Sequence, residues 1–163
     1  MSAITAARPS WVTYGLVILA TLAVLMLSGT VSSGSDDAWY AALNKSALNP
    51  PDITFAIVWP ILFLLMAVGA IMVRSAAGSF QAAAPALGLF FSQLIANLGW
   101  SFAFFGFQEP LLALLFLITL WVMIIAMISA FRRWSRRTAW LQAPYLVWVT
   151  FAGYLNTFIV LAN

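Results

Sequence analysis

The sequence contains neither cysteine nor histidine, and only 7% of its 163 residues are charged. The absence of both residue types excludes disulfides, zinc sites built on thiolate or imidazole, and catalysis by a histidine base. An ordinary soluble domain has about 25% charged residues, so this chain has too little polar surface to cover a water-soluble globule. Enzyme mechanisms that depend on cysteine or histidine are therefore excluded, and we expect no cofactor and no metal site.

What the chain has in abundance is apolar sequence: 64% of its residues are hydrophobic, and its mean hydropathy is +1.03. A helix needs about 20 apolar residues to cross a bilayer, so five crossings would use about 100 residues. The apolar runs predict five spanning helices, at about residues 11–31, 53–73, 82–107, 110–131 and 140–161. The runs lack the two-residue alternation of membrane β-barrels. We therefore predict an all-α integral membrane protein, a five-transmembrane-helix bundle forming one domain over residues 1–163.

The first apolar run has one alternative interpretation, a cleaved signal peptide. The apolar region of such a peptide is about 7–15 residues long, and this run is longer. We therefore expect the first run to be retained as a membrane helix.

The basic residues are distributed unevenly between the two sides of the expected bundle. One side holds Lys45 alone, whereas the other holds Arg8, Arg74, Arg132, Arg133, Arg136 and Arg137. Because basic residues collect in cytoplasmic loops, we expect the N-terminus to be cytoplasmic and the C-terminus to lie on the opposite side with the 32–52 loop. The net charge of +3 reflects these loops, and we expect no nucleic-acid partner.

The 32–52 loop combines acidic, aromatic and proline residues. Asp36 and Asp37 precede an apolar segment around Trp39, which predicts a short helix with an acidic cap. The Pro50-Pro51 pair stiffens the start of the next helix. Such a loop can close the mouth of a bundle as a lid, or it can lie flat in the membrane interface.

Aromatic and amide side chains recur at helical spacing in three of the expected helices. These faces comprise Phe55, Trp59 and Phe63; Gln93, Asn97, Trp100 and Phe104; and Tyr145, Trp148, Ala152 and Leu155. Packing between helices is one explanation, because polar groups within a membrane usually point toward other helices. A binding pocket is the other, since Trp59, Trp100 and Trp148 lie deep in their runs rather than at the interface. Three indoles and two amides would suit a flat, aromatic, mostly apolar ligand.

A second face of the third expected helix carries small residues at every fourth position. These are Ala84, Gly88, Ser92 and Ala96. Small residues at this spacing let another helix approach closely. That helix can belong to the same chain or to a second copy, so a homodimer is one of two interpretations.

Several motifs resemble one known family. They are Trp39-Tyr40-Ala41-Ala42-Leu43-Asn44-Lys45 with Asn49-Pro50-Pro51, then Gln93, Asn97, Trp100 and Phe104-Phe105-Gly106, then Pro144-Tyr145-Leu146-Val147-Trp148 with Leu155-Asn156. Together with Trp59, they resemble the translocator protein family, TspO/MBR, also called tryptophan-rich sensory proteins. The resemblance runs from Trp39 to Asn156.

The resemblance implies a five-helix bundle, often dimeric, that binds porphyrins and other tetrapyrroles. In animal relatives it also implies binding of cholesterol and synthetic drugs. The ligand-binding residues carried over by position are Tyr40, Pro50, Phe55, Trp59, Phe63, Asn97, Trp100, Trp148, Ala152 and Leu155. They coincide with the faces identified above, and the 32–52 loop corresponds to the family's lid.

The sequence also departs from the family pattern. The family usually has Trp before the proline pair and Pro earlier in the lid, where this chain has Leu48 and Ser46. The sterol motif requires a Tyr and a basic residue near the chain's end, and residues 155–163 contain neither. The sterol implication is correspondingly weakened.

Three classes of function follow from these observations. The leading hypothesis is a non-enzymatic membrane receptor for porphyrins, with a possible role in their transport or regulation. The alternative is a light-dependent porphyrin-degrading enzyme, which the resemblance implies for Trp59 and Trp148. An ion-coupled transporter is disfavoured, because no charged residue lies deep in any expected span.

Overall fold

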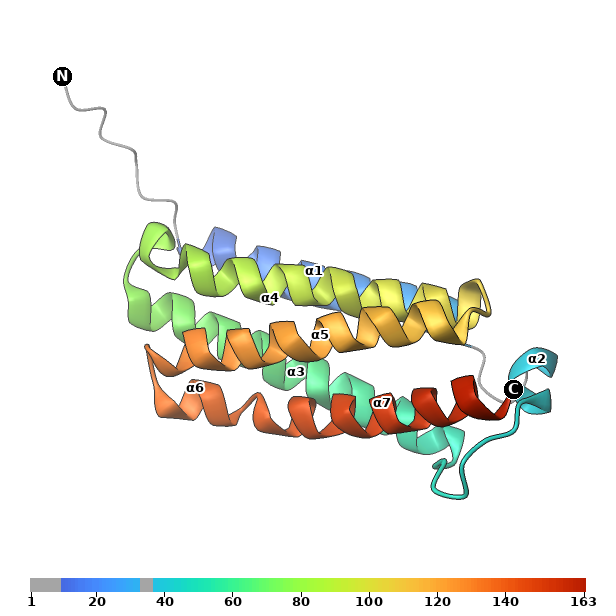
Figure 1. Cartoon of the computed structure of the whole chain (residues 1–163). Helices are drawn as coiled ribbons and strands as arrows, with labels where there is room; N and C mark the ends of the chain where they lie inside the picture. The colour runs from blue at the N-terminus through green and yellow to red at the C-terminus, as the bar shows by residue number, and fades with distance from the viewer. Residues whose placement is uncertain (1–9, 33–36) are drawn as a thin grey trace.

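The computed structural model describes residues 10–32 and 37–163 as a bundle of long, roughly parallel and antiparallel helices (Figure 1). The predictions about Arg8 and Asp36 lie outside the described residues. The long helices are α1 (Ser10–Val31), α3 (Asp52–Ala77), α4 (Phe80–Ser101), α5 (Pro110–Arg132) and α7 (Ala143–Ala162). Two short helices, α2 (Ala38–Ala42) and α6 (Arg136–Trp140), connect them.

The described residues contain five helical segments long and apolar enough to cross a membrane. This confirms the predicted five-helix membrane bundle. The chain is an integral, multi-pass membrane protein. Because lipid offers no hydrogen bonds to the backbone, each span satisfies its own peptide groups as a helix.

The helices pack in a closed order around the bundle. Helix α1 contacts α3 and α4, while α5 contacts α4 and α7, and α3 completes the arrangement by contacting α7. We call one end of the bundle the lid end, because it carries α2 and the loop up to Asp52 (Figure 1). The other end, which carries the turn between α5 and α6, is the arginine end.

Helix α3 extends one turn beyond the predicted boundary at residue 73. Arg74 therefore lies within the helix, where it is only 4% exposed. The helix ends at Gly78, whose φ of 69° is a left-handed conformation that glycine adopts without steric cost. A basic residue in the last helical turn is also stabilised by the helix dipole, so Arg74 does not stop the helix.

The expected helix 82–107 has two parts. After α4, residues Phe102–Gly106 form a π-helical turn, in which the Phe107 N–H donates to the Phe102 carbonyl at 2.7 Å. Such turns are rare and occur often at functional sites. Here the wider turn carries Phe104 and Phe105, which reappear below in the wall of a cavity.

The expected fifth helix, 140–161, is also divided. It begins earlier, as α6, and is interrupted before α7 starts at Ala143. Ser135 caps α6 by accepting from the Arg137 N–H, and the buried Thr138 hydroxyl bonds the Phe131 carbonyl at 2.9 Å. These bonds hold the turn that presents the four exposed arginines, Arg132, Arg133, Arg136 and Arg137.

The lid is anchored to the bundle through its own side chains. Asp37 caps α2, as its carboxylate accepts from the Trp39 and Tyr40 N–H groups at 2.8 and 3.2 Å. Farther along, Asn44 exchanges hydrogen bonds with Asn163, the last residue of the chain, in both directions. The described part of the lid is thus tied to the end of α7.

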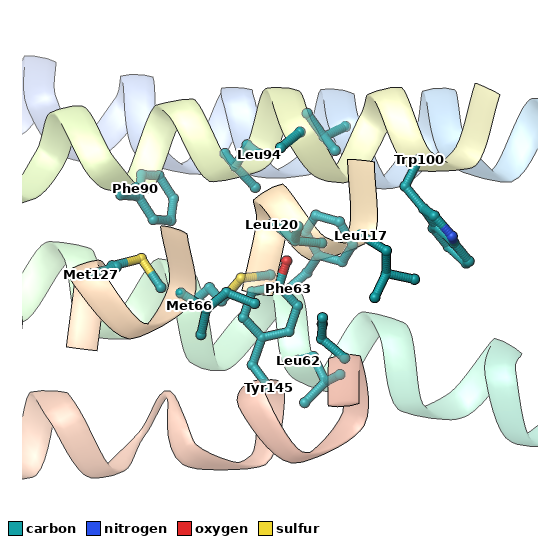
Figure 2. Close-up of a cluster of buried hydrophobic side chains, with 14 of the residues drawn as sticks. Leu62, Phe63, Met66, Phe90, Leu94, Trp100, Leu117, Leu120, Met127 and Tyr145 are labelled. Atoms are coloured by element: carbon teal, nitrogen blue, oxygen red, sulfur yellow. The ribbon is translucent and has the colours of Figure 1, made fainter. Parts of the chain in front are cut away.

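The arginine half of the bundle is tightly filled. Met66 of α3, Phe90 of α4, and Met127 and Phe131 of α5 are fully buried, and Figure 2 shows Met66, Phe90 and Met127 pointing toward a common interior. Gly69 allows the Gln142 side chain to lie against α3, since a Cβ there would meet the Gln142 amide at 2.2 Å. This half leaves little free space.

The face of small residues on α4 lies largely on the outside of the bundle. Ser92 is exposed, and a Cβ built on Gly88 would meet nothing within 4 Å. Only Ala96 is buried, and with Ser92 it borders a shallow apolar groove against α5 residues such as Leu115 and Phe116. Within one protomer, the described chain leaves most of this face uncovered.

Candidate functional site

A cavity of about 420 Å³ occupies the lid half of the bundle. Ligand pockets in proteins typically measure about 300–1,000 Å³, so its size fits a small-molecule site. Its wall is formed by residues from α1, the lid, α3, α4, the π-helical turn and α7. These are Leu25, Ser28, Gly29, Ser32, Tyr40, Asn49, Asp52, Phe55, Ala56, Trp59, Pro60, Phe63, Asn97, Trp100, Ser101, Phe104, Phe105, Ala152, Leu155, Asn156 and Ile159.

Indole and phenyl rings form the largest part of this wall. The Trp59 and Trp100 ring centroids lie 5.7 Å apart at an interplanar angle of 32°. Phe104 continues the series at 6.0 Å from Trp100, and Phe63 lies 6.0 Å from Trp59. Tilted rings at these separations are in favourable aromatic contact, and together they offer a broad π surface to a flat ligand.

A buried polar layer separates the cavity from the filled half of the bundle. The Tyr145 hydroxyl donates to the Gln93 side-chain oxygen at 2.8 Å and accepts from the Asn97 amide at 3.2 Å. The Gln93 amide also contacts the Met66 sulfur at 3.4 Å. Gln93 therefore packs between helices, whereas Asn97 both joins this layer and reaches the cavity wall.

A second set of hydrogen bonds orients the Trp100 indole. Its N–H donates to the Asn156 side-chain oxygen at 3.3 Å. The Asn156 amide in turn donates to the Pro110 carbonyl at 2.9 Å, which fixes the direction of the Asn156 side chain. Trp100 is 8% exposed, so an indole N–H left without this acceptor would be costly.

Helix α3 lacks one backbone hydrogen bond near Pro60. Proline has no N–H, so the Ala56 carbonyl cannot receive the usual i+4 helical hydrogen bond. Both residues line the cavity. The missing bond to the Ala56 carbonyl thus falls at the site.

The lid residues Tyr40, Asn49 and Asp52 line the cavity at the lid end of the bundle. The Asn49 amide donates to the Tyr40 hydroxyl at 3.4 Å. Burial raises the pKa of the Tyr40 phenol, the Asn49 hydrogen bond opposes this, and the negative charge of Asp52 adds to it. The Tyr40 hydroxyl is therefore neutral at physiological pH, when it can donate or accept a hydrogen bond.

Eight of the ten residues predicted to bind ligand lie together on the cavity wall. They are Tyr40, Phe55, Trp59, Phe63, Asn97, Trp100, Ala152 and Leu155. In the described structure, Pro50 and Trp148 are not part of this wall. The Trp148 ring packs against Phe55 at 5.5 Å, so it lies behind a wall residue.

The cavity also includes residues that were not among the ten predicted to bind ligand. Helix α1 supplies Leu25, Ser28 and Gly29, Ser32 follows the end of α1, and α7 supplies Asn156 and Ile159. The sequence offered one signal of the α1 contribution: two adjacent small residues, Ser28 and Gly29, near the end of a run of bulky apolar residues. No pattern within α1 indicates which neighbouring helix it faces, because its apolar residues surround it on all sides.

Comparison with known proteins identifies the family. The model of the TspO/MBR family matches residues 16–161. The chain is 38% identical over 151 residues to the tryptophan-rich protein TspO of Chlorobaculum tepidum, covering 93% of this chain and 96% of that protein. It is 35% identical over 151 residues to the translocator protein of Bos taurus, covering 91% and 88% of the two chains. The chain therefore belongs to the TspO/MBR family.

Proposed function

We propose that this protein is a membrane receptor for porphyrins and related flat, hydrophobic ligands, which it binds in the cavity beneath the lid. The observation that carries the proposal is the tilted pair of Trp59 and Trp100 rings on the wall of a 420 Å³ cavity. Burial of the ligand's ring area supplies most of the affinity, at about 25 cal/mol per Å² of apolar surface. Asn97, Asn156 and the serines of the wall orient its polar groups.

The residues available favour a metal-free tetrapyrrole. Histidine and cysteine, which are the strongest axial ligands for haem iron, do not occur in the sequence. We therefore expect a metal-free porphyrin to bind at least as well as haem. In this proposal the protein takes part in transport of the porphyrin or in regulation, and it does not convert the porphyrin chemically.

Quenching of tryptophan fluorescence by porphyrin tests the proposal directly. The purified protein in detergent should show saturable quenching, and a Trp59→Ala/Trp148→Ala double variant should lose most of it. Since removing two indoles also removes signal, the affinity should be measured independently from the shift of the porphyrin absorption band. An unchanged affinity in the double variant contradicts the proposed site.

Photochemical degradation of the bound porphyrin is the alternative function. It requires an indole beside the pigment, and Trp59 meets this requirement because it lies on the cavity wall. Trp148, the second indole of this hypothesis, lies behind Phe55. Illumination of the complex separates the two functions, because a receptor returns the pigment unchanged whereas an enzyme yields a new absorbing product.

We propose a homodimer through the uncovered face of α4. The exposed Gly88 and Ser92 and the groove beside Ala96 would let a second copy approach closely. Cross-linking of cysteines introduced at Gly88 in a native membrane would test this, as a monomer gives no dimer band.

We also propose that the arginine end is cytoplasmic and that the lid and the C-terminus lie on the opposite side. The four exposed arginines after α5 support this orientation. Labelling of a cysteine introduced at Ala47 by an impermeant reagent in intact cells would test this orientation.

A sterol is a weaker candidate ligand than a porphyrin, since the end of α7 lacks the Tyr and the basic residue that the sterol motif requires.

A further inference from the structure

Four arginines lie on the outside of the turn between α5 and α6, at the arginine end of the bundle (Figure 1). They are Arg132, Arg133, Arg136 and Arg137, and all four are exposed. Within residues 10–32 and 37–163, their guanidinium groups make no hydrogen bond and no ion pair. The donors of these four groups are therefore available to a ligand from outside the bundle.

The acidic residues that the structure describes lie at the opposite end of the bundle. Asp37 caps α2, Asp52 begins α3, and Glu109 precedes α5. No carboxylate of the described chain therefore neutralises the four arginines. Positive charges clustered in this way repel one another and produce a potential that attracts anions.

The turn that carries the arginines is held by hydrogen bonds on its inner side. The Thr138 hydroxyl, which is fully buried, lies 2.9 Å from the Phe131 carbonyl and 2.7 Å from the Ser135 carbonyl. The Gln142 amide donates to the Leu65 carbonyl at 3.3 Å and so joins the end of α6 to α3. Retention of a loop in the cytoplasm requires only its charge, whereas this turn also fixes the backbone positions of the arginines. Such preorganisation lowers the cost of binding.

Trp140 places α6 at the depth of the lipid headgroups. Its side chain is 74% exposed, and it follows Arg136 by four residues and Arg137 by three. Residues at these spacings lie on one face of a helix. Exposed tryptophans of membrane proteins collect at the membrane–water interface, and guanidinium groups bind phosphate oxygens through two parallel hydrogen bonds. One face of α6 thus combines an interfacial anchor with two groups suited to phosphate.

We propose that this arginine surface binds an anionic phospholipid, whose headgroup lies against Arg136 and Arg137. The span α5 ends at Arg132, so all four arginines lie immediately beyond the membrane, where basic clusters recognise anionic lipids. A zwitterionic lipid also offers a phosphate, but its ammonium group adds a positive charge beside the arginines. The surface therefore selects lipids with a net negative charge. This binding is separate from that of the porphyrin, which the cavity at the lid end holds.

Native mass spectrometry of the whole protein in a neutral detergent tests the proposal. The delipidated protein is titrated with phosphatidylglycerol or with phosphatidylcholine of the same acyl chains, and the bound lipids are counted. Wild type should bind phosphatidylglycerol more tightly. In Arg136→Gln/Arg137→Gln we expect its affinity to fall about tenfold, whereas that of phosphatidylcholine should change less than about twofold.

Two control variants separate the local site from general effects of charge. Arg136→Lys/Arg137→Lys keeps both charges but not the paired donors, and should lose less than about threefold in phosphatidylglycerol affinity. Lys45→Gln removes a positive charge from the lid end and should change it less than about twofold. An unaltered thermal midpoint in phosphatidylcholine would show that the glutamine variant is folded.

Three outcomes overturn the proposal. The first is an unchanged phosphatidylglycerol affinity in Arg136→Gln/Arg137→Gln, and the second is an equal loss for both lipids. The third is displacement of the lipid by soluble glycerophosphoglycerol or by a glutamate-rich peptide at concentrations similar to that of the lipid. A free anion or an acidic protein segment would then be the ligand of this surface.

Discussion

The two halves of the bundle are built from the same helices but differ in how they are filled. Toward the arginine end, Met66, Phe90 and Met127 close the interior completely. Toward the lid end, Pro60 interrupts the hydrogen bonds of α3 and the π-helical turn follows α4, and a cavity opens between them. The hydrogen-bonded layer around Tyr145 lies at the boundary. The cavity therefore lies where the backbone is irregular, in α3 near Pro60 and in the π-helical turn after α4.

The largest expected difference comes from replacing Ala by Leu at one position in each half, in two separate variants. Ala152 lines the cavity, whereas Ala70 is fully buried in the filled half. Ala152→Leu should weaken porphyrin binding by about tenfold or more and leave thermal stability nearly unchanged, because the added carbons occupy ligand space. Ala70→Leu should instead destabilise the protein by about 1–3 kcal/mol through overpacking.

Thermal unfolding in detergent and porphyrin titration of both variants provide the measurement. The comparison fails if Ala70→Leu is as stable as the wild type, or if Ala152→Leu binds porphyrin normally.

A smaller difference in porphyrin affinity is expected between substitutions of Trp59 and of Trp148. Trp59 is on the cavity wall, while Trp148 contacts the wall residue Phe55 from behind. Trp59→Leu should weaken binding by about tenfold, since an aromatic contact contributes about 0.5–1.5 kcal/mol beyond the area it buries. Trp148→Leu should have an effect of about threefold or less. Equal losses in absorption titrations of the two single variants would place both indoles against the ligand.

The boundary layer should contribute to stability more than to binding. Tyr145→Phe removes the hydroxyl that joins Gln93 and Asn97. Hydrogen bonds between membrane helices contribute about 0.6 kcal/mol on average, and this hydroxyl makes two, so we expect a loss of about 1 kcal/mol. The measurement is the thermal midpoint, with Tyr14→Phe as the control, because the Tyr14 hydroxyl bonds Ser75 at an exposed position. A larger loss in the control would contradict the assignment.

The smallest effect is expected at the lid. Asn163→Ala removes the two side-chain bonds to the Asn44 backbone and leaves the bundle interior intact. We expect little change in the thermal midpoint but a porphyrin dissociation rate raised about two- to fivefold, as the lid opens more often. Stopped-flow dissociation measures this, with Leu161→Ala as a control at an exposed neighbour. An unchanged rate would show that the lid does not limit release.

Hydrophobic runs and family motifs predicted the five spans and most of the wall, because apolar length and aromatic spacing are local properties. The Trp59 and Trp100 faces could be read in this way. The position of Trp148 could not, since its ring and the cavity are separated by Phe55, a residue of another helix. Facing between helices depends on rotation and tilt within the bundle, which no single helix specifies.

Backbone irregularities were the other feature that sequence patterns missed. Pro60 was visible, but the π-helical turn at Phe102–Gly106 has no comparable marker. Its residues are apolar and aromatic, like those of the preceding helix. The contribution of α1 was equally hidden, because that helix is apolar on every side.

The pairing of Asn44 with the final residue, Asn163, has a practical consequence for laboratory work on this protein. A purification tag fused to Asn163 would disturb the hydrogen bonds between Asn163 and Asn44 and would loosen the lid over the cavity. Purification tags should therefore be placed away from Asn163, or joined to it through a flexible spacer that leaves its hydrogen bonds to Asn44 intact.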